Sequence, residues 1–187
     1  MKTVLLRAPL LSISGYGVHC RQVFKWLEQR EDVKVYSQVV QWGNTCWMVS
    51  SELEEGIVGR IMETSSDIQN PDISIQVQLP DEWDSSLAKI NIGISAVVET
   101  DVCNPAWIDS MNKMDAVIVP SEHIRKTIEN TGNVTTKLYV IPEWYYEKID
   151  EKIETNIEIN LDTDFNFLTI AQFTGTDPYN DRKNLYF

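Results

Sequence analysis

Short runs of apolar, often β-branched residues alternate with stretches of helical periodicity along most of the chain, and this alternation constrains the fold more than any other feature. We expect strands over residues 3–6, 33–40, 73–79, 90–98, 116–119 and 138–141. The nearly continuous run over 90–98 is typical of a central parallel strand buried on both faces. Sequential parallel strands need crossover connections, usually helices. The sequence therefore predicts an α/β fold with a Rossmann-like, doubly wound parallel sheet.

The segments between these runs carry helix signals. We expect helices after the turn-rich stretch 12–17, over 51–62, over 105–111 and from Ser121 to Asn130. Asn104 is a candidate N-cap for the third of these helices, and Ser121 is a candidate N-cap for the fourth. The helix over 51–62 begins with a serine and early acidic residues, which is a usual helix start. Gly132 follows the fourth helix and predicts its end.

The chain is expected to contain one domain and the beginning of another. Residues 1–146 hold the strands and helices of the predicted sheet. Residues 147–164 contain seven acidic residues and two lysines without a strong apolar period, which is typical of a self-repelling linker. Residues 165–187 begin with a new strand over 165–171 and stop where its helix would start. A strand without its crossover cannot complete a βαβ unit, so we expect a fragment of a longer protein.

Charge and composition exclude several classes of function. The net charge of −12 disfavours nucleic-acid binding, because an acidic surface repels phosphates. The sequence has no apolar run of about 18 residues or more that could span a membrane, and its start is not a signal peptide. The three cysteines fit no zinc or CxxC spacing, and there are two histidines. We therefore predict a reduced, cytoplasmic protein without a metal site.

The first candidate site is the glycine-containing turn between the first strand and the first helix. Gly15 and Gly17 would let a ligand approach the backbone, where the helix N-terminus offers free N–H groups to an anion. A dinucleotide-binding turn would carry a third glycine where Cys20 stands, and an acid at the end of the second strand. Neither is present. His19 and Arg21 lie in the first turns of this helix, where they could face a ligand phosphate or hydroxyl.

Further candidates lie at the carboxyl ends of later strands, where ligands of open α/β sheets bind. Glu99 and Thr100 end the long run over 90–98, and a carboxylate there could hold sugar hydroxyls. Ser121 follows the run over 116–119 and would line the same edge. Arg182 and Lys183 are adjacent cations at an expected loop-to-helix junction, where they would suit a diphosphate.

Four segments together resemble glycosyltransferase family 4, the GT-B enzymes of group 1. The segments are Ser14–Gly17 with His19 and Arg21, Glu99-Thr100 followed by Trp107, Asp115–Glu122, and Arg182–Asn184. They come in the order found in that family and cover nearly the whole chain. The resemblance implies one half of a GT-B architecture, with Gly15 and Gly17 near a diphosphate and Lys183 as a phosphate-binding lysine.

The same resemblance implies the reaction and its partners. A hexosyltransferase of this kind moves a sugar from a nucleotide-sugar donor to a glycan or other hydroxyl acceptor with retention of configuration, usually without a metal or cofactor. The N-terminal domain shapes the acceptor side, and the C-terminal domain binds the nucleotide. That second domain is mostly missing here, so the resemblance assigns no catalytic residue, and this chain is expected to be inactive by itself.

Two other interpretations remain open. The chain could be a standalone Rossmann-like binding module that acts without catalysis, and the unpaired strand over 165–171 could join two copies into a homo-oligomer. It could also belong to a different nucleotide-dependent enzyme of GT-B shape, such as a sugar epimerase. The sequence that follows Phe187 in the gene would distinguish the transferase from the binding module.

Overall fold

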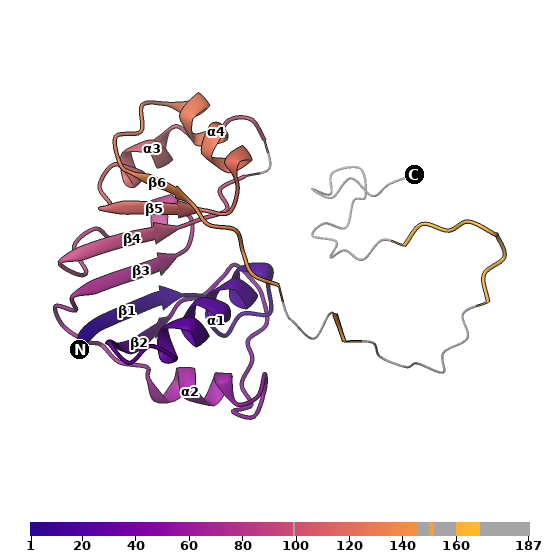
Figure 1. Ribbon diagram of the computed structural model, residues 1–187, viewed down its shortest axis with the longest axis horizontal. Helices are drawn as coiled ribbons and strands as arrows, with labels where there is room; N and C mark the ends of the chain where they lie inside the picture. The colour runs from indigo at the N-terminus through magenta and orange to yellow at the C-terminus, as the bar shows by residue number, and fades with distance from the viewer. Residues whose placement is uncertain (99, 146–149, 152–159, 169–187) are drawn as a thin grey trace. The chain divides into compact units, whose positions relative to one another are not determined.

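The computed structural model describes residues 1–98, 100–145, 150–151 and 160–168 of the 187-residue chain. In the described part, six parallel strands form one sheet in the order β2-β1-β3-β4-β5-β6 (Figure 1). The strands are β1 (Lys2–Ala8), β2 (Val33–Val39), β3 (Ile73–Val77), β4 (Ile90–Ile94), β5 (Ala116–Val119) and β6 (Leu138–Val140). The predicted α/β fold with a Rossmann-like parallel sheet is confirmed.

The strand order reverses between β1 and β3. The chain runs outward from β1 to β2, returns to pair β3 with β1, and then continues through β4 and β5 to β6. Beyond β2, Ser65 forms an isolated parallel bridge with Ser37, so the chain touches the outer edge of the sheet before it returns. This doubly wound arrangement creates a topological switch point at the carboxyl ends of β1 and β3, the usual ligand position in such folds.

In the part of the chain that the structure describes, four helices and a short 3-10 helix connect the strands. They are α1 (Gly15–Glu28), α2 (Ile57–Glu63), η1 (Pro80–Glu82), α3 (Ala106–Met111) and α4 (Glu122–Thr131). α1 and α2 share a core cluster with Leu6 and Ile75, whereas α3 and α4 share another with Val117 and Val119. Residues paired in register share a face of the sheet, and Ile94 pairs with Ile118, so Val117 and Val119 point the other way. The two helix pairs therefore cover opposite faces.

The apolar stripe of α1 explains why this helix forms and where it packs. Phe24 is fully buried and Leu27 is 2% exposed, and both join the core cluster of β1. Burying each of these side chains contributes roughly 1.5–3 kcal/mol. Ser14 caps the helix, because its side chain accepts a hydrogen bond from the Gly17 N–H at 3.1 Å. Burial of one stripe and this cap together fix the start and orientation of α1.

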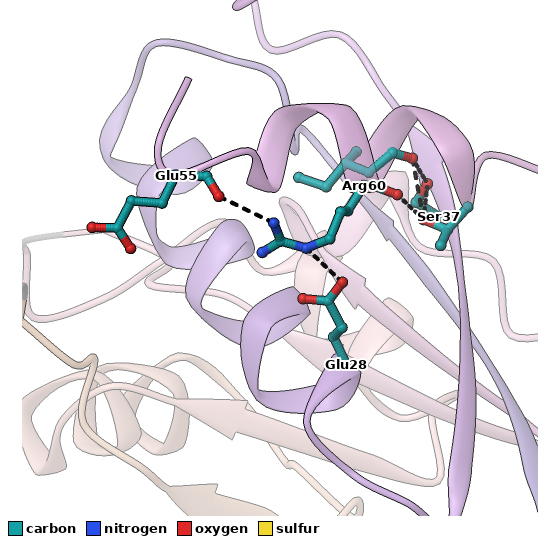
Figure 2. A network of polar contacts seen from close by, with 6 residues as sticks. Glu28, Ser37, Glu55 and Arg60 are labelled. Carbon is teal, nitrogen blue, oxygen red and sulfur yellow. Dashed lines mark hydrogen bonds and ion pairs between the residues drawn. The ribbon is translucent and has the colours of Figure 1, made fainter. Parts of the chain in front are cut away.

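The helix predicted over 51–62 is wrong in its first half, because α2 begins only at Ile57. Glu54, Glu55 and Gly56 all have positive φ angles, of 49°, 61° and 80°, so they form a left-handed turn before the helix. Arg60 on α2 holds this turn, since it donates to the Glu55 carbonyl at 3.2 Å and to the carboxylate of Glu28 on α1 at 2.7 Å (Figure 2). Ordinary propensity does not anticipate such a turn.

The strand predicted over 90–98 is too long, because β4 ends at Ile94. The Ser95 N–H still donates to the carbonyl of Ile118 on β5 at 3.2 Å, and the chain leaves the sheet after it. Val97 has a φ of 54°, which is unusual for a β-branched residue. The Val97 N–H donates to the Ser95 hydroxyl at 3.2 Å instead of continuing the ladder. The first residue, Ile90, is 43% exposed, so the strand is also not buried along its whole length.

The chain divides into two compact units, Met1–Tyr146 and Glu147–Phe187. In the described part of the second unit, Asn166 and Thr163 exchange hydrogen bonds of 2.7 Å, and the rings of Phe165 and Phe167 meet edge to face with their centroids 5.0 Å apart. Residues 165–168 do not form a strand, and the side chain of Phe167 is 89% exposed, so they lack a packed face there. The rest of the predicted strand lies outside the described residues.

Candidate functional site

The loop between β1 and α1 lies at the switch point and is built by close packing. A Cβ atom at Gly17 would collide with the carbonyl of Ser12, so only glycine lets the helix start pass this loop. Gly15 differs, because a Cβ there would meet nothing within 4 Å. Of the two glycines predicted to contact a ligand, Gly17 is required by the fold. Gly15 borders open space beside the first turn of α1, where backbone N–H groups favour anions.

Arg21 anchors this loop and also lines a cavity beside it. Its side chain is 4% exposed, and its Nε donates to Glu54 at 2.7 Å. Its Nη1 donates to the carbonyls of Leu10 and Ser12, each at 3.0 Å. A cavity of about 490 Å³ lies beside the pair and is also lined by Lys25 and Arg60. Two of the three guanidinium nitrogen atoms already have protein partners, so contacts within the protein account for the position of this side chain.

Tyr16, in the first turn of α1, connects this helix to the end of β4. Its hydroxyl oxygen accepts a hydrogen bond from the Ala96 N–H at 3.1 Å and lies 3.2 Å from the Ser95 hydroxyl. Its ring stacks on Trp42 with a centroid distance of 4.1 Å. Burial raises the pKa of the Tyr16 hydroxyl, although the hydrogen bonds from Ser95 and Ala96 oppose that rise. Tyr16 is therefore a neutral hydrogen-bonding bridge at neutral pH.

The carboxyl ends of four strands surround a small pocket, which we call the sheet-edge pocket. It is lined by Tyr16, His19, Val77, Ile94, Ser95, Ala96, Pro120, Ile141 and Glu143. Its volume is about 10 Å³, which is about the room that one water molecule needs. The pocket combines a phenol, an imidazole, a hydroxyl and a carboxylate. Such a set can bind the hydroxyl of a ligand at the pocket mouth but cannot enclose a sugar.

His19 contributes the imidazole of this pocket. Burial lowers the pKa of His19, and the negative charge of Glu143 opposes that shift. The imidazole is therefore neutral at pH 7. Its Nδ1 atom is buried and has no hydrogen-bond partner among the described residues. A neutral imidazole with one free nitrogen can accept a hydrogen bond from a ligand.

The other predicted site residues are placed differently. Ser121 caps α4 by accepting from the Ile124 N–H at 3.2 Å, and its neighbour Pro120 lines the sheet-edge pocket. Thr100 is exposed, and its carbonyl accepts from Thr127 of α4 at 2.8 Å, so it lies against that helix and does not line the pocket. Glu99, Arg182 and Lys183 lie outside the described residues.

The structure adds residues that sequence reasoning missed. Ser95 and Glu143 line the sheet-edge pocket, and Glu54 is the partner of Arg21. Ser95 was not recognised as a site residue because the strand over 90–98 was expected to continue past it. Glu143 had a recognisable signal, since it follows the end of the last strand and so must lie at the same sheet edge. Nothing in the local sequence indicates that Glu54 pairs with Arg21.

Neither a scan against models of known protein families nor a search of curated proteins finds a match to this chain. The fold and the geometry of the site are therefore the observations on which a function must rest. Among the described residues, no group of three or more His, Cys, Asp or Glu side chains could hold a metal ion. No helix in the described part of the chain is long and apolar enough to cross a membrane.

Proposed function

We propose that residues 1–146 are the N-terminal, acceptor-side domain of a retaining glycosyltransferase of GT-B architecture. In its full-length form, the enzyme would move a sugar from a nucleotide-sugar to an acceptor hydroxyl. The observation that carries this proposal is the position of the glycine loop at the switch point of a doubly wound sheet, with the sheet-edge pocket beside it at the carboxyl ends of β3, β4, β5 and β6. That point is where ligands of such sheets bind.

The glycine loop and the sheet-edge pocket suit different substrates, the donor and the acceptor. The open space at Gly15, beside the N-terminus of α1, suits the diphosphate of a donor. His19 and Glu143 suit an acceptor hydroxyl, because a neutral imidazole and a carboxylate both accept hydrogen bonds. The small pocket is consistent with a site that a second domain completes, as closure between domains excludes water from transferase chemistry.

The proposal predicts that this chain lacks most of the donor site. Titration of the chain with UDP-, GDP- and ADP-sugars by calorimetry should give no binding in the micromolar range and no transfer. A longer product that includes a C-terminal domain should bind one of these donors and transfer its sugar. Micromolar donor binding and turnover by the present chain would overturn the assignment of the donor site to a second domain.

Gly15 offers a sharper test in that longer product. Gly15→Asp adds a negative charge in open space at the start of α1, where it should not disturb the fold. Repulsion of a diphosphate about 4 Å away is large enough to weaken donor affinity by more than about tenfold. Gly15→Ala is the matched control, since it adds a Cβ without charge and should leave affinity within about threefold. Equal affinities for the two variants would contradict a phosphate at this position.

A further inference from the structure

An apolar groove opens beside the sheet-edge pocket, on the face of the sheet that α1 covers. One wall is α1, where His19, Gln22, Val23 and Trp26 follow one another at helical spacing along a single face. The floor is the sheet, and the other wall is the chain that leaves β6 and turns back toward α1 (Figure 1). The floor and second wall consist of Ile75, Ile94, Ile118, Ile141, Pro142 and Trp144. We call this feature the α1 groove.

The topology explains why the groove is open. α1 and α2 pack beside β1 and β2, whereas α3 and α4 cover the opposite face at β5. On the α1 side, β4 and β5 therefore carry apolar residues that no helix of the described chain covers. Ile118 is only partly buried, and Trp26 and Trp144 at the two walls are 51% and 56% exposed. Exposing such surface to water is unfavourable, so a ligand that covers it gains binding free energy.

The size of the groove fits a small molecule. Its volume is about 310 Å³, which lies at the lower end of the range of ligand pockets. An apolar protein cavity of roughly 150 Å³ is enough to bind benzene. The α1 groove is therefore large enough for a fused pair of rings, whereas a protein partner would need an interface of roughly 800 Å² on each side.

The walls also carry hydrogen-bonding groups that lack partners. Nδ1 of His19 and Oε1 of Gln22 are both buried without a hydrogen-bond partner among the described residues. An unsatisfied buried acceptor costs free energy that a ligand can recover by donating a hydrogen bond. The groove lining contains no Asp, Glu, Lys or Arg, and burial lowers the pKa of His19, so the surface is uncharged at neutral pH.

From these observations we propose that the α1 groove binds a neutral, largely apolar ring compound that carries a hydroxyl or N–H donor. The rings would lie against Ile94 and Ile118 between the two tryptophans, and the donor would face His19 or Gln22 after a rotation of that side chain. This binding needs no second domain and does not depend on the transferase proposal, so the present chain can test it directly.

Indole and benzothiophene form a matched pair of probes, because they have nearly the same shape and only indole has an N–H donor. We expect calorimetry and ligand-observed NMR with the full 187-residue chain to detect binding of both compounds. One hydrogen bond should make indole bind about fivefold more tightly. Indole-3-acetate should bind at least about tenfold more weakly than indole, because its carboxylate would enter an apolar groove of a protein with net charge −12.

Two variants locate the site. Val23→Phe fills the groove from α1 and should reduce indole affinity by more than about tenfold, whereas Val49→Phe is a control at an exposed loop residue outside the lining. Gln22→Leu and His19→Phe each remove one of the two unpaired polar groups and leave the buried stripe of α1 unchanged. At least one of them should make indole and benzothiophene bind equally, and circular dichroism should verify that each variant is folded.

Three results would overturn the proposal. One is the absence of saturable indole binding to the folded chain at millimolar probe concentrations. Another is equal loss of binding with Val23→Phe and Val49→Phe, which would place the probe elsewhere. The third is concentration-dependent dimerisation that Trp26→Ala abolishes while indole does not bind, because that result would make a second copy of the chain the occupant.

Discussion

Arg21→Met is expected to destabilise the fold by about 3–4 kcal/mol. The substitution keeps most of the buried volume but removes the charged head that joins Glu54 to the β1–α1 loop. Removing one partner of a buried ion pair typically costs about 3–5 kcal/mol, because the other charge is left uncompensated. The carboxylate of Glu54 is 30% exposed, so water can replace part of the lost interaction and the expected cost falls in the lower part of this range.

The two carbonyl contacts add to that cost. Arg21 donates to Leu10 and Ser12 at 3.0 Å, and both acceptors would lose a charged donor in a buried place. A hydrogen bond to a charged group contributes about 1.5–3 kcal/mol. These contributions are not additive, since the loop can relax when its anchor is removed. A loss of about 3–4 kcal/mol would be a large fraction of the 5–15 kcal/mol that stabilises a typical domain.

Urea unfolding followed by circular dichroism measures this cost, with the free energy of unfolding extrapolated to water. Arg125→Met is the matched control, because Arg125 forms its ion pairs with Glu122 and Glu129 on the exposed surface of α4. Exposed pairs of this kind contribute at most about 1 kcal/mol. A double-mutant cycle with Glu54→Gln isolates the pair itself. Equal effects of Arg21→Met and Arg125→Met would refute the inference that Arg21 anchors the loop.

Three further predictions concern the same domain. Gly17→Ala should destabilise it by about 3 kcal/mol or more in urea, because the added Cβ meets backbone that cannot move away cheaply. The wild-type free energy of unfolding should fall as the pH drops below about 6.5. The reason is that the pKa of His19 is lowered in the folded protein, so the unfolded chain binds the proton more readily. The variant His19→Gln should lack this part of the pH dependence. Cys46 should react with iodoacetamide in the folded protein while Cys20 stays unmodified by mass spectrometry, since Cys20 is buried and burial raises its pKa.

The alternation of strands and helices could be predicted because burial imposes a period on the sequence. Val117 and Val119 face one core cluster and Ile118 faces the other side of the sheet, so the strand must be apolar throughout. The same apolar continuity misplaces the end of β4. Val97 and Val98 extend the run but pack against the α3 and α4 cluster from a loop. An apolar run predicts that its residues are buried, but it does not predict their backbone angles.

The turn before α2 could not be predicted, because its causes lie far away in the chain. Positive φ angles at Glu54 and Glu55 are each unfavourable for residues other than glycine. They persist because Arg21 holds the side chain of Glu54. Arg60 likewise holds the carbonyl of Glu55 (Figure 2). Local sequence preferences favour a helix through 51–62, and tertiary contacts override them.

The site shows the same division between local and distant causes. The turn that contains Gly15 and Gly17 could be predicted because glycine acts on the local backbone, whereas the Ser14 cap is a finding of the structure. Arg21 was expected to face a ligand because it lies in the first turns of a helix behind a glycine loop. Its buried role depends on Glu54, which lies on the segment before α2. The hydrophobic periodicity of the two segments does not predict a long-range pair of this kind.

The anchors of the β1–α1 loop also bear on how a ligand would bind there. Ser12 pairs with Trp47 through an isolated bridge, and its hydroxyl lies 2.6 Å from that of Thr45, while Arg21 holds its carbonyl and Ser14 caps α1. A loop fixed from three sides loses little conformational entropy when a ligand arrives, so binding free energy is not spent on ordering it. Rigidity at Gly15 therefore favours an anion site that exists before the anion binds. The sheet-edge pocket holds only about one water, so under the proposed function the groups that surround the rest of a sugar would come from outside this pocket.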